Sequence, residues 1–167
     1  LRETPGVHFQ LSRTLSARIL AATAGEGMRA ALPKVYSVLC ALEPADRRIF
    51  TLETALALVE QTRRRVLLID MADDAGACAR AFGLPAKPVS EEELREADLR
   101  DPAVLSRIVQ PHASGLGIMT LPSSVLAGRL YRSIFLLMNL VRERCDFVLI
   151  SLPTELGDVE KSVLFES

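Results

Sequence analysis

The sequence predicts a doubly wound α/β fold, in which a mostly parallel sheet carries helices on both faces. Short, continuous apolar runs of the kind that form strands buried on both faces recur along the chain. Helical patterns separate these runs, and an alternation of strand and helix is typical of parallel sheets. Hydrophobic residues make up 49% of the 167 positions, enough for a real core and too many for a disordered chain. The expected strands cover residues 35–41, 66–70, 117–121 and 147–152.

Helices are expected between and before these strands. Residues 5–22 form an amphipathic pattern, and glycines then open a linker up to Pro33. Residues 43–46 read as a loop, and residues 51–61 contain good helix formers without Gly or Pro. Arginines at 63–65 follow that helix, where cations favour the helix dipole. Further helices are expected over 72–81, from the capping box that begins at Ser90, from the Asp101–Pro102 start to residue 109, and over 125–144.

Composition excludes several classes of function. Lys and Arg total 20 against 21 Asp and Glu, and Trp is absent, which argues against a nucleic-acid surface built on bulk charge or on stacking. Cys40, Cys78 and Cys145 form no C-x-x-C pair, so neither a disulfide framework nor a zinc site is indicated, and a reducing cytoplasm fits best. His8 and His112 have no metal-ligand spacing around them. Neither a signal peptide nor a transmembrane segment is visible.

Ligands of doubly wound sheets bind at the carboxyl ends of the strands. The segments to inspect are therefore those that follow Ala41, Asp70, Leu121 and Leu152. In order and spacing they resemble the MinD/ParA group of P-loop ATPases, and especially its CpaE/TadZ-type branch. The matching pieces, within residues 34–160, are VYSVLCAL, TLETALALVEQTRRRVLLIDMADDAG, SGLGIMTLPSS and LVRERCDFVLISLPTELGD. The resemblance implies a P-loop-NTPase-like fold with a phosphate loop after the first strand, an Asp ending the second, and an Mg²⁺-linked Asp on the fourth.

The segment that corresponds to the phosphate loop departs from that pattern. Residues 41–51 contain no glycine, and Pro44 removes a backbone donor that could bind phosphate. Glu43 and Asp46 would repel phosphate at close range. The position of the family's Lys falls on Arg48 or Ile49.

The metal-binding positions depart as well. The Mg²⁺ hydroxyl position falls on Ile49 or Phe50, with Thr51 next to it. Ser151 stands where the resemblance places an Asp, so only Asp70 is retained. No catalytic residue and no metal ligand is therefore expected.

The positions left to contact a nucleotide are Arg47, Arg48, Thr51 and Asp70. Two interpretations follow. Arg47, Arg48 and the helix start near Thr51 could still hold an anion, or the two arginines are solvated loop residues beside a degenerate site. Asp70 could act with Asp73 and Asp74 on a nucleotide or metal, or could simply bond local backbone N–H groups.

The first residues carry a second resemblance. PGVHFQLSRTLSARILA is similar to the helix that closes bacterial cyclic-nucleotide-binding domains. We therefore expect residues 1–32 to be the tail of an upstream domain, and residues 33–167 to be a MinD/ParA-like α/β domain that is incomplete at its C-terminus. A related arrangement, in which such a sensor and a degenerate P-loop-like region precede a patatin-like lipase, is an alternative parent architecture.

The sequence thus predicts a pseudo-ATPase that serves as a scaffold or interaction module of a larger cytoplasmic bacterial protein, in positioning or signalling. No cofactor is expected, with ATP and Mg²⁺ as the alternative, and the expected partner is another protein or a second copy of the chain, not nucleic acid. The rival functions are a divergent but active ATPase of the MinD/ParA group, and a regulatory linker between a cyclic-nucleotide sensor and a patatin-like lipase.

Overall fold

The computed structural model describes residues 14, 17, 34–39, 43–72, 74, 76–96, 101, 103–126 and 131–165. Its centre is a five-stranded sheet with the order β1-β5-β2-β4-β3. The strands are β1 (Lys34–Val38), β2 (Val66–Asp70), β3 (Gln110–Pro111), β4 (Leu116–Thr120) and β5 (Phe147–Ser151). The first four in the spatial order run parallel, and only the short β3 is antiparallel to its neighbour. The predicted, mostly parallel α/β sheet is confirmed.

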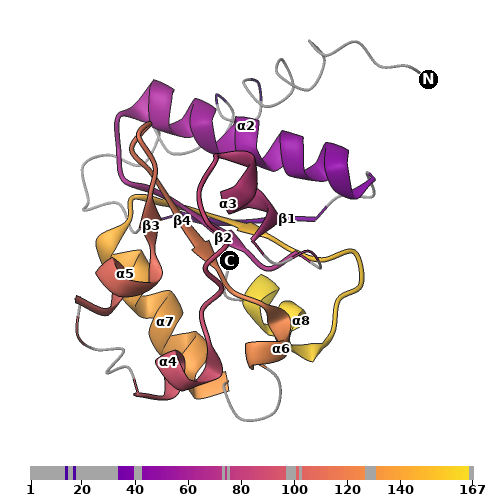
Figure 1. Ribbon diagram of the computed structural model, residues 1–167, viewed down its shortest axis with the longest axis vertical. Coiled ribbons are helices and arrows are strands. Elements are labelled where there is room, and N and C mark those ends of the chain that lie inside the picture. The colour runs from indigo at the N-terminus through magenta and orange to yellow at the C-terminus, as the bar shows by residue number, and fades with distance from the viewer. Residues whose placement is uncertain are drawn as a thin grey trace.

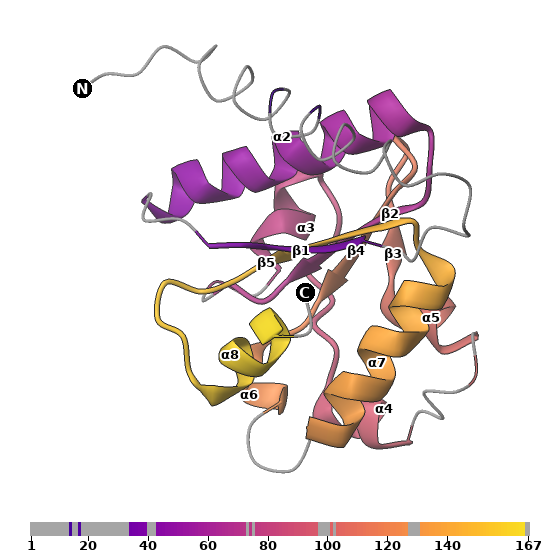
Figure 2. The ribbon, with the colours of Figure 1, turned by 180° about the vertical axis from the view of Figure 1, so that it is seen from behind.

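Helices cover both faces of the sheet (Figures 1 and 2). One face carries α2 (Pro44–Thr62) and α3 (Ala77–Ala81). The other face carries α4 (Glu91–Glu96), α5 (Ala103–Ile108), α6 (Ser123–Leu126), α7 (Tyr131–Arg144) and α8 (Asp158–Phe165). Among the described residues, no helix is long and apolar enough to cross a bilayer.

The central strand β2 shows why its sequence is continuously apolar. Val66 and Leu68 pack with the core under α2 and α3, whereas Leu67 and Ile69 pack with the core under α7. Successive side chains of a strand point to opposite faces, so a strand covered on both faces buries every residue. All five residues of β2 are buried.

Two helix starts confirm their sequence signals. The Ser90 hydroxyl accepts a bond from the Glu93 backbone N–H at 3.0 Å, and the Glu93 carboxylate accepts one from the Ser90 N–H at 2.8 Å. This reciprocal pair is a capping box, and it opens α4. The Asp101 carboxylate accepts a bond from the Ala103 N–H at 2.9 Å at the start of α5.

The loop predicted over residues 43–46 is wrong. Helix α2 begins at Pro44, and the Arg47 N–H already donates to the Glu43 carbonyl oxygen at 2.9 Å. A proline in the first helical position loses no hydrogen bond and has its φ preset for a helix. Residues 44–50 are therefore the first turns of a helix and not a loop.

Other boundaries moved or were missed. Helix α3 begins at Ala77 and not at 72, because Gly76 precedes it with a φ of 82°. The short β3 and helix α8 were not predicted. Strand β1 begins at Lys34, and the rest of the expected run, residues 40–41, lies outside the described residues.

Some predictions fall on residues that the structure does not describe. The helix expected over 5–22 lies outside them, except that Thr14 and Ala17 are helical. The helix expected over 125–144 corresponds to the end of α6 and to α7, and residues 127–130 between them are not described. His8, Cys40 and Asp73 also lie outside the described residues.

The packing of α2 on the sheet predicts which of its apolar residues stabilise the fold. Leu58 is fully buried on this helix, whereas Ile49, two and a half turns earlier, is 46% exposed. Leu58→Ala should lower the free energy of unfolding by about 2–5 kcal/mol, since it removes packing and leaves a cavity. Ile49→Ala should change it by about 0.5 kcal/mol or less. Urea unfolding of both variants measures this, and equal losses would contradict the described packing of α2.

Candidate functional site

The register of the sheet aligns a row of residues at its carboxyl edge. Asp70 on β2 is paired with Ser151 on β5 and with Thr120 on β4, and Ser151 is paired with Val38 on β1. Asp70 follows Val66 and Leu68 at steps of two, so its side chain points to the face covered by α2 and α3. Polar side chains from three neighbouring strands therefore lie side by side under α2.

A cavity of about 290 Å³ lies between this row and the start of α2. It brings together residues far apart in the sequence. The side chains that matter for its chemistry are Pro44, Arg47, Arg48, Asp70, Cys78 and Ser151. Three of the four residues predicted for a nucleotide site thus line one cavity.

Asp70 is fully buried and bonded to the chain that follows it. Its carboxylate accepts hydrogen bonds from the backbone N–H of Ala72 at 3.3 Å and from that of Cys78 at 3.1 Å. Burial raises the pKa of this carboxyl above its usual value, and the two backbone donors and the Arg48 charge only partly oppose that rise. Asp70 therefore binds backbone N–H groups of the segment between β2 and α3. This agrees with the second interpretation of the sequence, in which Asp70 bonds local backbone N–H groups.

Arg47 has an unusual position for an arginine. It is 2% exposed, and its guanidinium donates to the Thr154 hydroxyl at 2.8 Å. This contact joins α2 to the segment after β5, across 107 positions of the sequence. The interpretation of Arg47 as a solvated loop residue is wrong, because the residue belongs to the first turn of a helix packed on the sheet.

Arg48 and Asp74 form a looser pair at the mouth of the cavity. The guanidinium of Arg48 lies 3.6 Å from the Asp74 carboxylate, which also pairs with Arg80. The Arg80 hydrogen bond is the main reason why the pKa of Asp74 is lowered. Arg48 is thus partly neutralised by an acid of its own chain.

Thr51 lies apart from the other predicted residues. Its hydroxyl donates to the Arg47 carbonyl oxygen at 2.9 Å, one helical turn back, and the side chain is fully buried. It is absent from the cavity lining. The structure thus brings Arg47, Arg48 and Asp70 together and leaves Thr51 in the helix.

Cys78, Thr154 and Thr120 were not predicted as part of this region. Cys78 hydrogen-bonds Asp70, and its burial, followed by the Asp70 charge, raises the pKa of the thiol, so the group is not an activated nucleophile. The Thr120 hydroxyl is buried and has no hydrogen-bond partner among the described residues. Thr120 and Thr154 could have been found from the sequence, since Thr120 lies next to the end of a predicted strand and Thr154 lies just after another, whereas Cys78 carries no such signal.

The described lining of the cavity differs from phosphate and Mg²⁺ sites in several groups. Phosphate sites at a helix start use free backbone N–H groups and the positive end of the helix dipole. Here Pro44 supplies no N–H at the first position, and Glu43 and Asp46 add negative charge beside it. Ser151 offers a hydroxyl where a carboxylate would hold Mg²⁺. Among the described residues, no three His, Cys, Asp or Glu side chains gather to hold a metal.

Comparison with known proteins identifies the fold. No family model matches the chain, and no curated protein matches it. Solved structures do. A ParA family ATPase from Chlorobium tepidum superposes with a TM-score of 0.65 at 16% identity, over 80% of this chain and 57% of that one. The septum site-determining protein MinD from Pyrococcus horikoshii, complexed with Mg-ADP, gives 0.60 at 16% identity, over 80% and 54%.

A third similar structure is the kinase domain of the Escherichia coli tyrosine kinase ETK, with a TM-score of 0.64 at 19% identity, over 89% of this chain and 57% of that domain. This chain therefore spans little more than half the length of these structures. At such identities the likeness establishes a ParA/MinD-type, P-loop-NTPase-like fold, and no activity.

The buried carboxyl of Asp70 predicts a pH dependence. Because its folded pKa is raised, Asp70 stabilises the fold below its unfolded pKa, and that contribution is lost as pH rises through the folded value. Asp70→Asn should therefore gain stability relative to the parent chain as pH rises from about 3.5 to 7. Urea unfolding of both chains across this pH range measures the difference between their free energies of unfolding. The other carboxyl groups contribute equally to both chains, so their contributions cancel. A difference that is flat, or that falls with pH, would contradict a raised pKa.

Proposed function

We propose that this chain is a ParA/MinD-like domain without ATPase activity, and that it serves as a scaffold or interaction module within a larger bacterial cytoplasmic protein. One observation carries the proposal: two of the groups at the nucleotide position, Asp70 and Arg47, are each bound to another part of this chain. Asp70 is held by backbone N–H groups, and Arg47 by Thr154. A ligand would have to displace these contacts.

The energetics support this reading. Hydrogen bonds to charged groups are worth about 1.5–3 kcal/mol each, and a micromolar affinity is about 8 kcal/mol. Loss of the glycine-rich backbone donors, the Lys and the metal acid removes most of such an affinity. Arg48 could restore one contact, but the negative charges of Glu43 and Asp46 oppose it.

The divergent ATPase remains the second candidate for a specific reason. Arg47 and Arg48 both line the cavity that also contains Asp70, so two cations lie where phosphates would be bound. Placement in the CpaE/TadZ-type branch, and the linker role between a cyclic-nucleotide sensor and a patatin-like lipase, rest on sequence resemblance. The residues that carry the second resemblance lie outside the described part of the chain, apart from Thr14 and Ala17.

Nucleotide binding separates the two candidates. Calorimetric titration of the 167-residue chain with ATP and with ADP, with and without Mg²⁺, should show no binding tighter than about 10 μM. The reason is that Pro44 lacks an N–H at the start of α2 and that Glu43 and Asp46 add negative charge beside it. Lys161→Ala is the matched control, since α8 packs on the face of the sheet opposite α2. A tighter dissociation constant that Arg48→Ala abolishes and Lys161→Ala does not would instead establish a working nucleotide site.

Self-association is the simplest form of the proposed scaffold. We expect a dimer of this chain to form without nucleotide. Because no nucleotide should bind in the cavity, none should regulate dimer formation. Light scattering over a range of concentrations measures this. A monomer at every concentration, both with and without ATP, would leave a different protein as the partner.

A further inference from the structure

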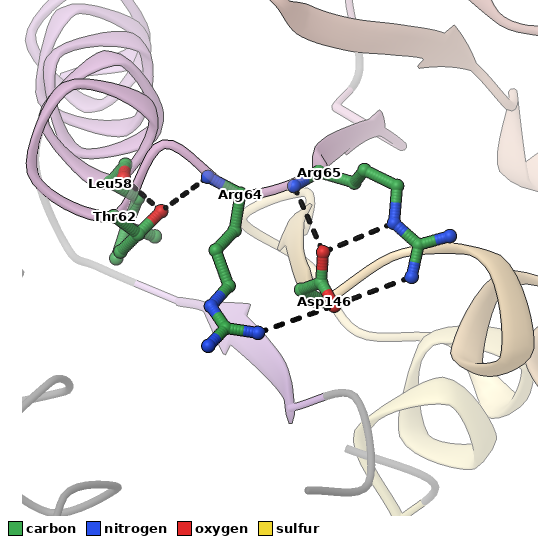
Figure 3. Close-up of polar contacts among 5 residues, drawn as sticks. All are labelled: Leu58, Thr62, Arg64, Arg65 and Asp146. Atoms are coloured by element: carbon green, nitrogen blue, oxygen red, sulfur yellow. Dashed lines mark hydrogen bonds and ion pairs between the residues drawn. The ribbon is translucent and has the colours of Figure 1, made fainter. Parts of the chain in front are cut away.

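A basic hollow lies at the amino edge of the sheet, opposite the cavity described above. Helix α2 ends at Thr62, and Arg63, Arg64 and Arg65 then lead into β2. Figure 3 shows Thr62, Arg64 and Arg65 at this junction. The hollow has a volume of about 600 Å³, and all three arginines line it. The loop before β4 contributes Ser114 and Gly115 to its wall, and the turn before β5 contributes Asp146.

Arg65 pairs with Asp146, the one acidic residue in the lining of this hollow. Its guanidinium donates to both oxygens of the Asp146 carboxylate, at 3.1 and 3.3 Å, and its backbone N–H donates to one of them at 3.0 Å. The hydrogen bond from Arg65 is the main reason why the pKa of Asp146 is lowered. Figure 3 shows this fork, with the Arg64 guanidinium on the other side of the carboxylate.

Among the described residues, the charges of Arg63 and Arg64 are largely uncompensated. Arg64 reaches Asp146 only at 4.0 Å and is 65% exposed. Within the described part of the chain, no acidic side chain pairs with Arg63, which is also exposed. With three guanidinium groups against one carboxylate, the hollow has an excess of two positive charges.

The backbone at Arg63 is strained for an arginine. Its φ of 54° and ψ of 28° place it in the left-handed region, at the helix end where glycine is preferred. An arginine here costs stability that a glycine would recover. A residue kept in a costly conformation on an exposed surface points to a role for its side chain.

A second, more apolar hollow of about 530 Å³ adjoins the first. The two share Arg65 and Gly115, and Leu105, Val109 and Pro111 contribute to the wall of the second. Charged and apolar binding surface therefore follow one another along the same edge. This combination fits an extended peptide that presents carboxylates and an apolar side chain, and arginines are enriched at protein interfaces.

We propose that this edge, the basic hollow together with its apolar neighbour, binds an acidic peptide segment of a partner protein, with glutamate or aspartate at Arg63 and Arg64 and an apolar side chain at Leu105 and Val109. The proposal deepens the interaction role proposed above and rests on it. A nucleic acid fits less well, because Asp146 and the apolar wall would face its phosphates and the chain as a whole carries a net charge of −1.

Fluorescence polarisation tests the site directly. The probe is a labelled peptide in which glutamates flank a leucine, and the matched peptide has glutamines in their place. The 167-residue chain should bind the acidic peptide, more weakly as salt rises, and should not bind the glutamine peptide. Arg63→Gly and Arg64→Gln should each weaken binding about fivefold, whereas Lys161→Gln, which removes an exposed charge from α8, should not.

Arg63→Gly also separates function from folding. Relief of the left-handed strain should raise the midpoint of thermal unfolding while binding falls. Absence of binding at millimolar concentrations of chain, or equal binding by all variants, would overturn the proposal. So would duplex DNA that binds as tightly as the peptide and with the same dependence on Arg63 and Arg64. ATP binding in the calorimetric test would overturn the pseudo-ATPase role and leave this site in place, so the two failures are distinguishable.

Discussion

The parallel pairing of β5, β2 and β4, in which the ends of the three strands align, is the constraint on which the rest of the structure depends. It places Ser151, Asp70 and Thr120 side by side at the carboxyl edge, beneath α2. A carboxyl buried at that point must find hydrogen-bond donors, and the backbone N–H groups of Ala72 and Cys78 supply them. The path of the chain from β2 into α3 follows from this requirement.

The same edge carries groups that differ from those of a phosphate-binding loop. In this chain α2 starts on a proline, and its first buried arginine is anchored to Thr154. These contacts stabilise the junction between α2 and the segment after β5. These polar groups therefore contribute to the stability of the fold.

The two edges of the sheet differ in charge balance. At the carboxyl edge, Arg48 and Arg80 share Asp74, and Arg47 is buried against a neutral hydroxyl. At the amino edge, Asp146 serves Arg65 and leaves neighbouring arginines exposed. Charges that are neutralised inside the chain stabilise it, whereas exposed charges of one sign attract partners of the other sign. The difference favours the amino edge as the surface available for recognition.

The sequence by itself determined the local features. Continuous apolar runs predicted the four longer strands to within a few residues, since a strand buried on both faces is apolar at most of its positions. The capping box at Ser90 and the Asp101 cap were also readable, because each involves residues three or fewer positions apart. The prediction of a loop over residues 43–46 was wrong for a local reason. Pro44 is compatible both with a loop and with the first position of a helix.

Only the tertiary structure decided which groups meet. The bond from Arg47 to Thr154 joins residues 107 positions apart, and the fork from Arg65 to Asp146 joins residues 81 positions apart. Such pairs depend on strand order and register, which place β5 between β1 and β2 although it is last in sequence. The packing around the end of β2 also decided that the pKa of the Asp70 carboxyl is raised. Desolvation depends on the residues packed around a group, so the residue type alone does not predict it.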